Sequence, residues 1–211
     1  LIRRLCWRND HSLFKRSNNT PGKEDTLISV YHPDEKVITY DRETWWGDSW
    51  DPSDYGMDYD FSKPFFVQFR ELLERVPHMP LFDSKSVNAR FCNVTVEQKN
   101  CYLISAAWRS EDCMYCNRLW HGKFTHDSYT SFATEFCYEN VYCSDSSKLF
   151  FSRESEGCLD SYFLYDCRNC SNCILSTNLR NKSYCIENVQ YTKEEFFKKK
   201  EELALNTRLG V

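Results

Sequence analysis

Glycine is scarce in this chain, with only six copies among 211 residues. The sequence contains no glycine-rich phosphate-binding loop, no GxSxG nucleophile elbow and no HExxH zinc-protease motif. These absences remove the nucleotide-binding and hydrolytic classes that such motifs identify, and no Cys and His stand out as a catalytic pair. We therefore expect a protein that binds or scaffolds and does not catalyse.

Long apolar runs and excess positive charge are also missing. No stretch approaches the roughly 18 apolar residues of a membrane-spanning helix, and the N-terminus has no signal-peptide pattern. The formal net charge is -4, so no overall basic field attracts nucleic acid or anionic lipid. We expect a soluble protein with no membrane partner. Nucleic acid is the least favoured partner, because only the basic arm from Arg3 to Lys23 could hold it and the acidic residues 48–60 follow soon after.

The changes of composition along the chain favour three segments. Residues 1–80 carry a basic arm, two β-rich runs, an aromatic and acidic loop and a helix pattern. Residues 81–191 are repetitive and rich in cysteine, and residues 192–211 form a helical pattern. The expected fold is mainly β, with a small N-terminal hairpin and one helix packed on a parallel β-solenoid that a C-terminal helix caps.

The N-terminal segment predicts a hairpin followed by a helix. Residues 27–31 and 37–40 are β-rich, and a short polar loop joins them. Ser62 can cap a helix whose second position is Pro64, in which apolar residues from Phe65 to Val76 recur every three or four positions before Pro77 stops it. We expect a small hairpin and an amphipathic helix.

Between them lies a loop in which large aromatic residues alternate with carboxylates. Such a loop could form a stacking platform for a sugar or a base, or bind calcium through the carboxylates around Gly56. Packing of its rings against one another and onto the helix that follows is the more ordinary interpretation. The candidate platform residues are Trp45, Trp46, Trp50, Asp51 and Asp54.

From Asn100 onward a short unit recurs at intervals of roughly a dozen residues. It consists of Asp or Asn, a small residue and a large apolar residue. Asn and Asp tolerate left-handed backbone, and Cys and Ser are small enough to stack inside a narrow core. The pattern favours a parallel β-solenoid with two units, or about 22 residues, per coil, although an antiparallel meander would give similar spacing. The copies begin at Asn100, Asp112, Asp127, Asn140, Asp160 and Asn172, and degenerate copies begin at Lys148 and Lys182.

Twelve cysteines are far above the usual share, and one group of them has the spacing of a zinc site. Two thiolates and two imidazoles suit tetrahedral zinc. The alternative, which we favour, is that repeat cysteines stand beside two surface histidines. The candidate ligands are Cys113, Cys116, His121 and His126.

A second group, Cys167, Cys170 and Cys173, has the CxxCxxC spacing of part of an iron–sulfur motif. Cys158 or Cys185 could supply a fourth ligand. Thiols at every third residue also arise when stacked corners each place one small residue inward, and we favour this structural interpretation. No cofactor is therefore assured, and zinc is the leading alternative.

The last segment opens with a capping-box pattern, Thr192 followed by Glu195. Phe196 and Phe197 stand on one side of the helix that it predicts. Solenoids need their ends covered, so we expect this helix to cap the repeat stack.

Several long strings carry a family resemblance over nearly the whole chain. They are Trp45-Trp46 with Asp48 and Trp50-Asp51-Pro52, Asp54-Tyr55-Gly56 with Asp58 to Asp60, Phe61-Ser62-Lys63-Pro64-Phe65-Phe66, Asn100-Cys101-Tyr102-Leu103, Ser161-Tyr162-Phe163-Leu164-Tyr165-Asp166-Cys167 and Leu179-Arg180-Asn181-Lys182-Ser183-Tyr184-Cys185-Ile186. On these strings the chain resembles uncharacterised cysteine-rich proteins that are abundant in small-genome bacteria of the candidate phyla radiation.

The resemblance implies a zinc-ribbon-like N-terminal part and a tract of dense cysteine repeats, but no particular activity. The ribbon's paired cysteines would fall at Asn18, Pro21, Asp41 and Thr44, where this sequence has none. The ribbon's shape is therefore expected here without its metal. The resemblance also implies the reducing cytoplasm of a bacterium, where cysteines are free thiols or metal thiolates rather than disulfides.

Overall fold

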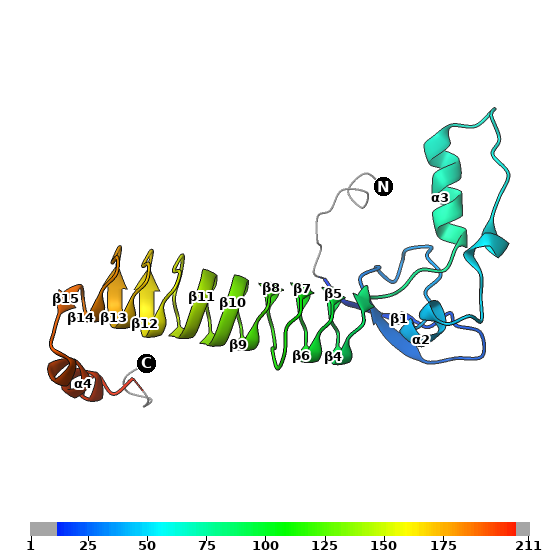
Figure 1. Cartoon of the computed structure of the whole chain (residues 1–211). Helices are drawn as coiled ribbons and strands as arrows, with labels where there is room; N and C mark the ends of the chain where they lie inside the picture. Colours follow the sequence, from blue (N-terminus) through cyan, green and yellow to red (C-terminus); the bar gives the residue numbers. More distant parts are fainter. Residues whose placement is uncertain (1–11, 206–211) are drawn as a thin grey trace. The chain divides into compact units, whose positions relative to one another are not determined.

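The computed structural model describes residues 12–205, and the chain divides into two compact units, Leu1–Phe82 and Asp83–Val211 (Figure 1). We call them the N-terminal unit and the solenoid unit, and describe each by itself. The fold is mainly β with few helices, as expected. Within residues 12–205, no helix is both long enough and apolar enough to cross a membrane.

The N-terminal unit contains the predicted two-stranded antiparallel hairpin, in which the predicted run over residues 27–31 overlaps β2 but its partner strand is a different one. β1 (Phe14–Ser17) pairs with β2 (Thr26–Ser29). The predicted second strand over residues 37–40 is not a strand, and makes one isolated bridge between Thr39 and His78. The first strand instead comes from the segment that the sequence assigned to a basic arm.

Arg16 explains why this segment joins the hairpin. Its guanidinium donates to the backbone oxygens of His32, Glu35 and Val37 at 2.5–2.6 Å. These bonds hold the loop beside β1, so a side chain satisfies loop carbonyls that a neighbouring strand would otherwise have to pair. Arg16 belongs to the basic arm that was considered for nucleic-acid binding, but its guanidinium serves to hold the hairpin together.

Three helical segments follow the hairpin: α2 (Arg42–Trp46), the 3-10 turn η1 (Pro52–Tyr55) and α3 (Phe65–Arg75). The last of these confirms the predicted helix. The predicted cap is wrong, because the Ser62 hydroxyl donates to the Asp60 carboxylate at 2.6 Å and Pro64 takes the N-cap position.

The apolar side of α3 is half-buried over most of its length and exposed at Phe65. Gln68 is the buried residue of this helix, and its amide donates to the backbone oxygens of Asp60 and Lys63. Phe65 and Phe66 are more than half exposed. The amphipathic pattern therefore identified the helix correctly, although the residue of α3 that is fully buried is Gln68 and not one of the apolar residues.

The solenoid unit is a stack of about nine turns, in which successive strands pair in parallel until the last antiparallel pair. Its strands are β3 (Asp83–Ser84), β4 (Val87–Arg90), β5 (Asn93–Val96), β6 (Lys99–Tyr102), β7 (Ser105–Trp108), β8 (Asn117–Trp120), β9 (Lys123–His126), β10 (Tyr129–Tyr138), β11 (Val141–Phe150), β12 (Leu159–Tyr165), β13 (Ser171–Thr177), β14 (Ser183–Ile186) and β15 (Val189–Gln190). The predicted parallel solenoid is confirmed.

Each coil contains twelve residues. Tyr129 of β10 pairs with Val141 of β11, and Cys173 of β13 pairs with Cys185 of β14, twelve positions apart in both cases. The predicted period of about 22 residues is wrong, because one recurring unit completes a whole coil rather than half of one.

The corners of the coil recur every third residue. From Lys85 to Glu187, every third residue has a positive φ, between 46° and 63°. Twelve residues per coil and three per side give four sides. Left-handed backbone costs a residue other than glycine roughly 1 kcal/mol, and bonds between coils offset this cost. The Leu103 N–H, for example, donates to the Arg90 oxygen of the preceding coil at 3.0 Å. Asn100 and Asp112 occupy such corners, which explains why Asn and Asp recur.

Two of the predicted copies are out of register with these corners. Asn140 points inward instead and is fully buried. Its amide donates to the Leu149 oxygen at 2.7 Å, and its side-chain oxygen accepts the Ser152 N–H at 3.0 Å. In the last copy the corner is Tyr184 rather than Lys182.

The residue after each corner points into the coil, and most inward residues are small side chains that carry a donor. The Cys101 thiol donates to the Lys99 oxygen at 3.3 Å. The Ser146 hydroxyl donates to the Ser144 oxygen at 2.7 Å and accepts the Cys158 N–H of the next coil at 3.1 Å. All eleven described cysteines occupy these inward positions: Cys92, Cys101, Cys113, Cys116, Cys137, Cys143, Cys158, Cys167, Cys170, Cys173 and Cys185.

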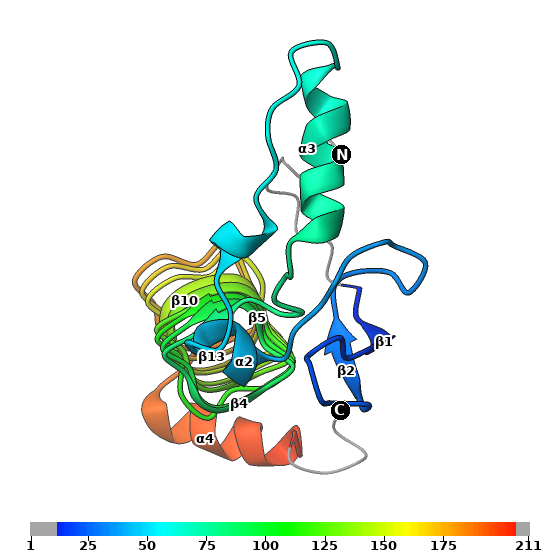
Figure 2. The same ribbon diagram turned by 90° about the vertical axis from the view of Figure 1, so that its right-hand side faces the viewer.

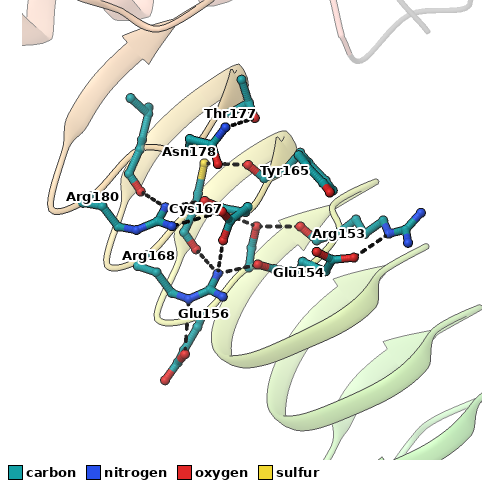
Figure 3. Close-up of polar contacts among 12 residues, drawn as sticks. Arg153, Glu154, Glu156, Tyr165, Cys167, Arg168, Thr177, Asn178 and Arg180 are labelled. Carbon is teal, nitrogen blue, oxygen red and sulfur yellow. Dashed lines mark hydrogen bonds and ion pairs between the residues drawn. The ribbon is translucent and has the colours of Figure 1, made fainter.

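Polar side chains also tie the coils together on the outside (Figure 3). The Arg168 guanidinium donates to the Glu154 backbone oxygen of the preceding coil. Arg180 does the same to Asp166 one coil later, and also pairs with the Asp166 carboxylate at 3.0 Å. Exposed ion pairs of this kind add little individually, but they make the outer wall regular.

The C-terminal end of the stack is covered in two ways. β15 pairs antiparallel with β14 and occupies its free edge. The predicted helix is confirmed as α4 (Lys193–Glu202), with the capping box of Thr192 and Glu195 in place. Seen along the stack, the coils superpose and α4 lies against their outside (Figure 2). The helix therefore covers the flank of the last coils.

Candidate functional site

The structure does not bring the four predicted zinc ligands together. Cys113 and Cys116 point into the coil and are almost completely buried. His121 occupies a left-handed corner on the outside, and the His126 side chain also faces outward, one residue after inward Thr125. The thiols and the imidazoles therefore stand on opposite sides of the solenoid wall.

The predicted iron–sulfur group is likewise built into the wall. Cys167, Cys170 and Cys173 point inward from three successive sides of one stretch of coil, and their thiols donate to backbone oxygens two residues earlier. Across residues 12–205, no group of three or more His, Cys, Asp or Glu side chains is arranged to hold a metal ion.

Burial keeps the core thiols protonated. It raises the pKa of Cys116, Cys158 and Cys173 to about 12, and the pKa of Cys143 to about 11, against partial opposition from backbone hydrogen bonds. A thiolate is the form that attacks substrates and binds metals. At neutral pH these thiols therefore act as hydrogen-bond donors to the backbone.

The candidate platform of the N-terminal unit is a cluster of rings packed on one another. Trp45 contacts Trp46 edge to face, with ring centroids 5.0 Å apart, and Trp50 donates its indole N–H to the Trp45 oxygen at 3.2 Å. The Asp51 carboxylate accepts from the Ser53 N–H at 2.8 Å and caps η1. Asp54 lies within that turn. Asp51 is thus committed to local structure, and the loop is packed by its own rings as expected.

A polar cluster occupies the place that the family resemblance assigns to zinc. The Asp41 carboxylate accepts the Thr44 N–H at 3.0 Å, pairs with Lys23 at 2.9 Å and contacts the Asn18 amide at 3.5 Å. Burial by itself would raise the pKa of Asp41, but the bonds from Lys23 and Thr44 outweigh it and hold the pKa far below 3.8. Asn18, Asp41 and Thr44, three of the four positions where the resemblance would place cysteine, therefore lie together, and the Lys23 ammonium pairs with the Asp41 carboxylate.

Replacing Asp41 with alanine should loosen this cluster. The substitution removes the N-cap of α2 and the partner of Lys23, and losing such a cap costs about 1–2 kcal/mol. Because the folded pKa lies below the unfolded one, the stabilisation is present above pH ~4 and fades as the pH falls below it. Hydrogen exchange of residues 14–46 should accelerate by roughly 5- to 30-fold at pH 7.

The matched control for this prediction is Asp41→Asn, which keeps an oxygen at the cap and removes the charge. It should accelerate exchange less than Asp41→Ala and abolish the acid dependence. Equal exchange in wild type and Asp41→Ala would show that the cluster does not hold the hairpin to α2.

The solenoid unit carries a surface that sequence reasoning missed. Large apolar residues recur at the same outward position of the coils, interrupted by His126 in one of them, and therefore stack in one column. Their neighbours one residue later form a second column beside it. We call this surface the aromatic flank: Tyr102, Met114, Tyr138, Phe150, Tyr162, Ile174 and Ile186 in the first column, and Phe91, Leu103, Tyr115, Phe151, Phe163 and Leu175 in the second.

The rings of the aromatic flank contact one another along the stack. Phe150 and Tyr162 stack with centroids 5.0 Å apart, and so do Phe151 and Phe163. Tyr138 meets Phe151 edge to face at 5.4 Å. Most of these rings are half-buried by their stacked neighbours, whereas Met114, Tyr115 and Leu175 are exposed. A contiguous apolar patch on a folded chain can mark a binding site.

α4 covers only one end of the aromatic flank. Phe196 of α4 is fully buried against Ile174 and Ile186. Beyond it, a groove of about 630 Å³ opens between α4 and the next coils. Its lining is Phe150, Phe151, Tyr162, Phe163, Phe197, Lys200, Glu201 and Leu205.

A second exposed column lies on another side of the solenoid. Trp108 pairs in register with Trp120, and Trp120 with Phe132, and all three are at least one-third exposed. Trp108 is covered in part by the Arg109 guanidinium, which lies 5.7 Å from its ring and is held by Glu97 at 2.7 Å. None of these three residues lines the groove beside α4.

The signal for the aromatic flank was present in the sequence. The third residue of each recurring unit is large and apolar, as in Tyr102, Met114, Tyr162 and Ile174. With two units per coil, successive rings would have pointed to opposite sides. With one unit per coil, they stack on the same side. Because the sequence analysis expected two units per coil, it did not predict the aromatic flank.

Comparison with known proteins gives no matching protein-family model and no similar curated protein.

Proposed function

We propose that this chain is a noncatalytic binding scaffold, whose solenoid presents the aromatic flank to another macromolecule. The observation that carries the proposal is the apolar column that continues past α4 into an open groove. Parallel coils linked at every corner make a rigid support, and rigid supports hold binding residues in place at little entropic cost.

The chemistry of the core supports the same proposal. The described thiols point inward and donate to backbone oxygens, and burial raises the pKa of several of them, such as Cys116 and Cys158. A metal-thiolate function would need thiols that converge, and the described thiols are spread along the wall. The free thiols also support a reducing compartment such as the bacterial cytoplasm.

The alternative of nucleic-acid binding through the basic arm has less support. Arg3, Arg4 and Arg8 lie outside the described residues, while Arg16 and Lys23 are engaged within the N-terminal unit. The resemblance to the cysteine-rich family remains a proposal, which the polar cluster around Asp41 supports.

A dye that fluoresces in apolar surroundings tests the binding face. Anilinonaphthalene sulfonate should become fluorescent on the folded protein, because its rings fit the groove and Lys200 can pair with its sulfonate. The double substitution Phe151→Ser and Phe163→Ser should remove more than half of this signal, since it deletes one of the two ring stacks in the groove.

The control is a matched pair of rings away from the aromatic flank. Phe124 and Phe136 stack at 4.8 Å on other corners of the coil, and serine at both positions should leave most of the dye signal. An equal loss from both double variants would contradict a specific face. The noncatalytic proposal would be contradicted if the protein turned over a substrate and one substitution on the aromatic flank abolished that turnover.

A further inference from the structure

α4 shows which kind of element the aromatic flank accepts. Its two phenylalanines lie on the last coils, where Phe196 is buried against Ile174 and Ile186. Phe197 approaches the Tyr184 ring with centroids 6.3 Å apart. A helix that carries two adjacent aromatic residues therefore fits the columns of this surface.

Lysines of the same helix complete the contact. The Lys200 ammonium lies 4.8 Å from the centre of the Tyr162 ring, and Lys199 lies 5.0 Å from that of Tyr191. A cation over an aromatic face is attracted by the ring's electrons. Lys200 follows Phe196 by four residues, which is one helical turn, so the pattern that binds is an aromatic residue with lysine one turn later.

The uncovered part of the aromatic flank repeats these features. Phe150, Phe151 and Phe163 offer rings at the edge of α4, and the first column continues to Tyr138. His126 then separates Tyr138 from Met114 and Tyr102 in this column. Apolar residues in the same columns bind α4 on the neighbouring coils. The open surface is therefore continuous with an interface that the structure already contains.

The charges beside the open part suit a lysine-bearing partner. Asp127 and Glu139 stand on the second column, next to Tyr138. The negative charge of Glu139, together with partial burial and the charge of Asp127, raises the pKa of the Tyr138 hydroxyl. The carboxylates thus act on the surface of the column itself, where a lysine one turn after an aromatic residue would arrive.

The dimensions also fit a helix. Coils in parallel register are spaced by about 4.8 Å, so the five coils between Tyr102 and Phe150 extend over roughly 20 Å. A helix rises about 1.5 Å per residue, so about 13 residues would cover that length. α4 itself lies mainly across the last coils, as the view along the stack shows (Figure 2), so it shows that this surface accepts a helix, and the direction along the column belongs to the proposal.

We propose that the open part of the aromatic flank, from Tyr102 to Phe163, docks an amphipathic α-helix of a partner protein that carries a pair of aromatic residues followed one turn later by lysine. This inference rests on the proposed binding function and names the partner's chemistry. The partner helix would lie along the column with its rings on Tyr138 and Phe150 and its lysines toward Glu139.

A synthetic peptide with the sequence of residues 191–205 tests the proposal in trans. Labelled with a fluorophore and titrated with the whole protein, it should bind saturably in the micromolar range. Tyr138→Ser together with Phe151→Ser should weaken binding by about tenfold, and Glu139→Lys should weaken it a few-fold. The control protein with Phe124→Ser and Phe136→Ser should bind like wild type, and a peptide with alanine at both phenylalanines should not bind.

Three outcomes would overturn the proposal. One is the absence of binding to the folded wild-type protein. The second is binding that increases when Phe196→Ala releases α4 but ignores Tyr138→Ser and Phe151→Ser, since the peptide would then only replace α4. The third is binding that requires deletion of residues 206–211, which would assign the surface to the chain's own C-terminus. Dye binding at the groove without peptide binding would leave the binding scaffold standing and remove only the helical partner.

Discussion

Raising the pH above 9 should unfold the solenoid unit steeply. Four buried thiols have pKa values of about 11 to 12 in the folded protein, against an ordinary value of 9.0: Cys116, Cys143, Cys158 and Cys173. Unfolding exposes them to water and restores the ordinary value. At pH 10 the unfolded chain has released protons that the folded chain still holds, so the free energy of unfolding falls.

The sign and the size follow from proton linkage. Below pH 9 both states keep the thiol protons and stability does not depend on these groups. Between pH 9 and the folded pKa, each thiol lowers the free energy of unfolding by about 1.4 kcal/mol per pH unit. At pH 10 the four together cost about 5 kcal/mol, which is comparable to the whole stability of a small domain. Urea unfolding at several pH values, under reducing conditions, measures the slope.

Serine at two of these positions provides the control. The columns already contain inward serines next to them, such as Ser146 before Cys158 and Ser161 before Cys173, so the smaller hydroxyl fits the same bonds. Because serine does not ionise in this range, Cys158→Ser with Cys173→Ser should about halve the slope. A slope that is unchanged by the double substitution would show that other groups cause the alkaline unfolding.

The inward positions were accessible to sequence reasoning because their chemistry is restrictive. A narrow coil admits small side chains, and a side chain with a donor satisfies the backbone oxygen beside it, as Cys101 and Ser146 do. The recurrence of Cys, Ser and Asn therefore predicted a solenoid, in which the cysteines were expected to be core residues. Asn140 was misplaced because asparagine suits a left-handed corner and a buried, fully bonded position equally well.

The candidate site was less accessible, because it depends on the exact length of the coil. Whether Tyr138 and Phe150 share a side cannot be read from the type of either residue. It depends on whether twelve or about 22 residues complete a turn, and the sequence spacing of the units is the same in both cases. The polar cluster around Asp41 was hidden for a similar reason, since Lys23 and Asp41 meet only through the fold of the hairpin.

Deleting one whole coil should leave a shorter but folded solenoid. Removal of residues 141–152 joins Asn140 to Arg153, which enters the position that Val141 held, since the two pair in register. Every later residue then keeps its inward or outward direction and its column, so Tyr138 comes to lie next to Tyr162. In a repeat stack the stability is roughly the sum of the coils and their contacts, so one coil of about nine is a modest loss. Circular dichroism and a urea transition should show a cooperative β fold.

Deleting eleven residues, 141–151, should have the opposite effect although it removes less. All later residues then shift by one position, which moves Cys158, Leu164 and Cys167 away from the inside and turns charged corner residues such as Glu154 and Asp166 toward it. An unpaired charge inside the wall costs several kcal/mol, so the coils after the junction should not fold. Removal of about 22 residues should fail in the same way. If it were tolerated while the twelve-residue deletion was not, the longer coil would be the correct one and the aromatic flank would be divided between two sides.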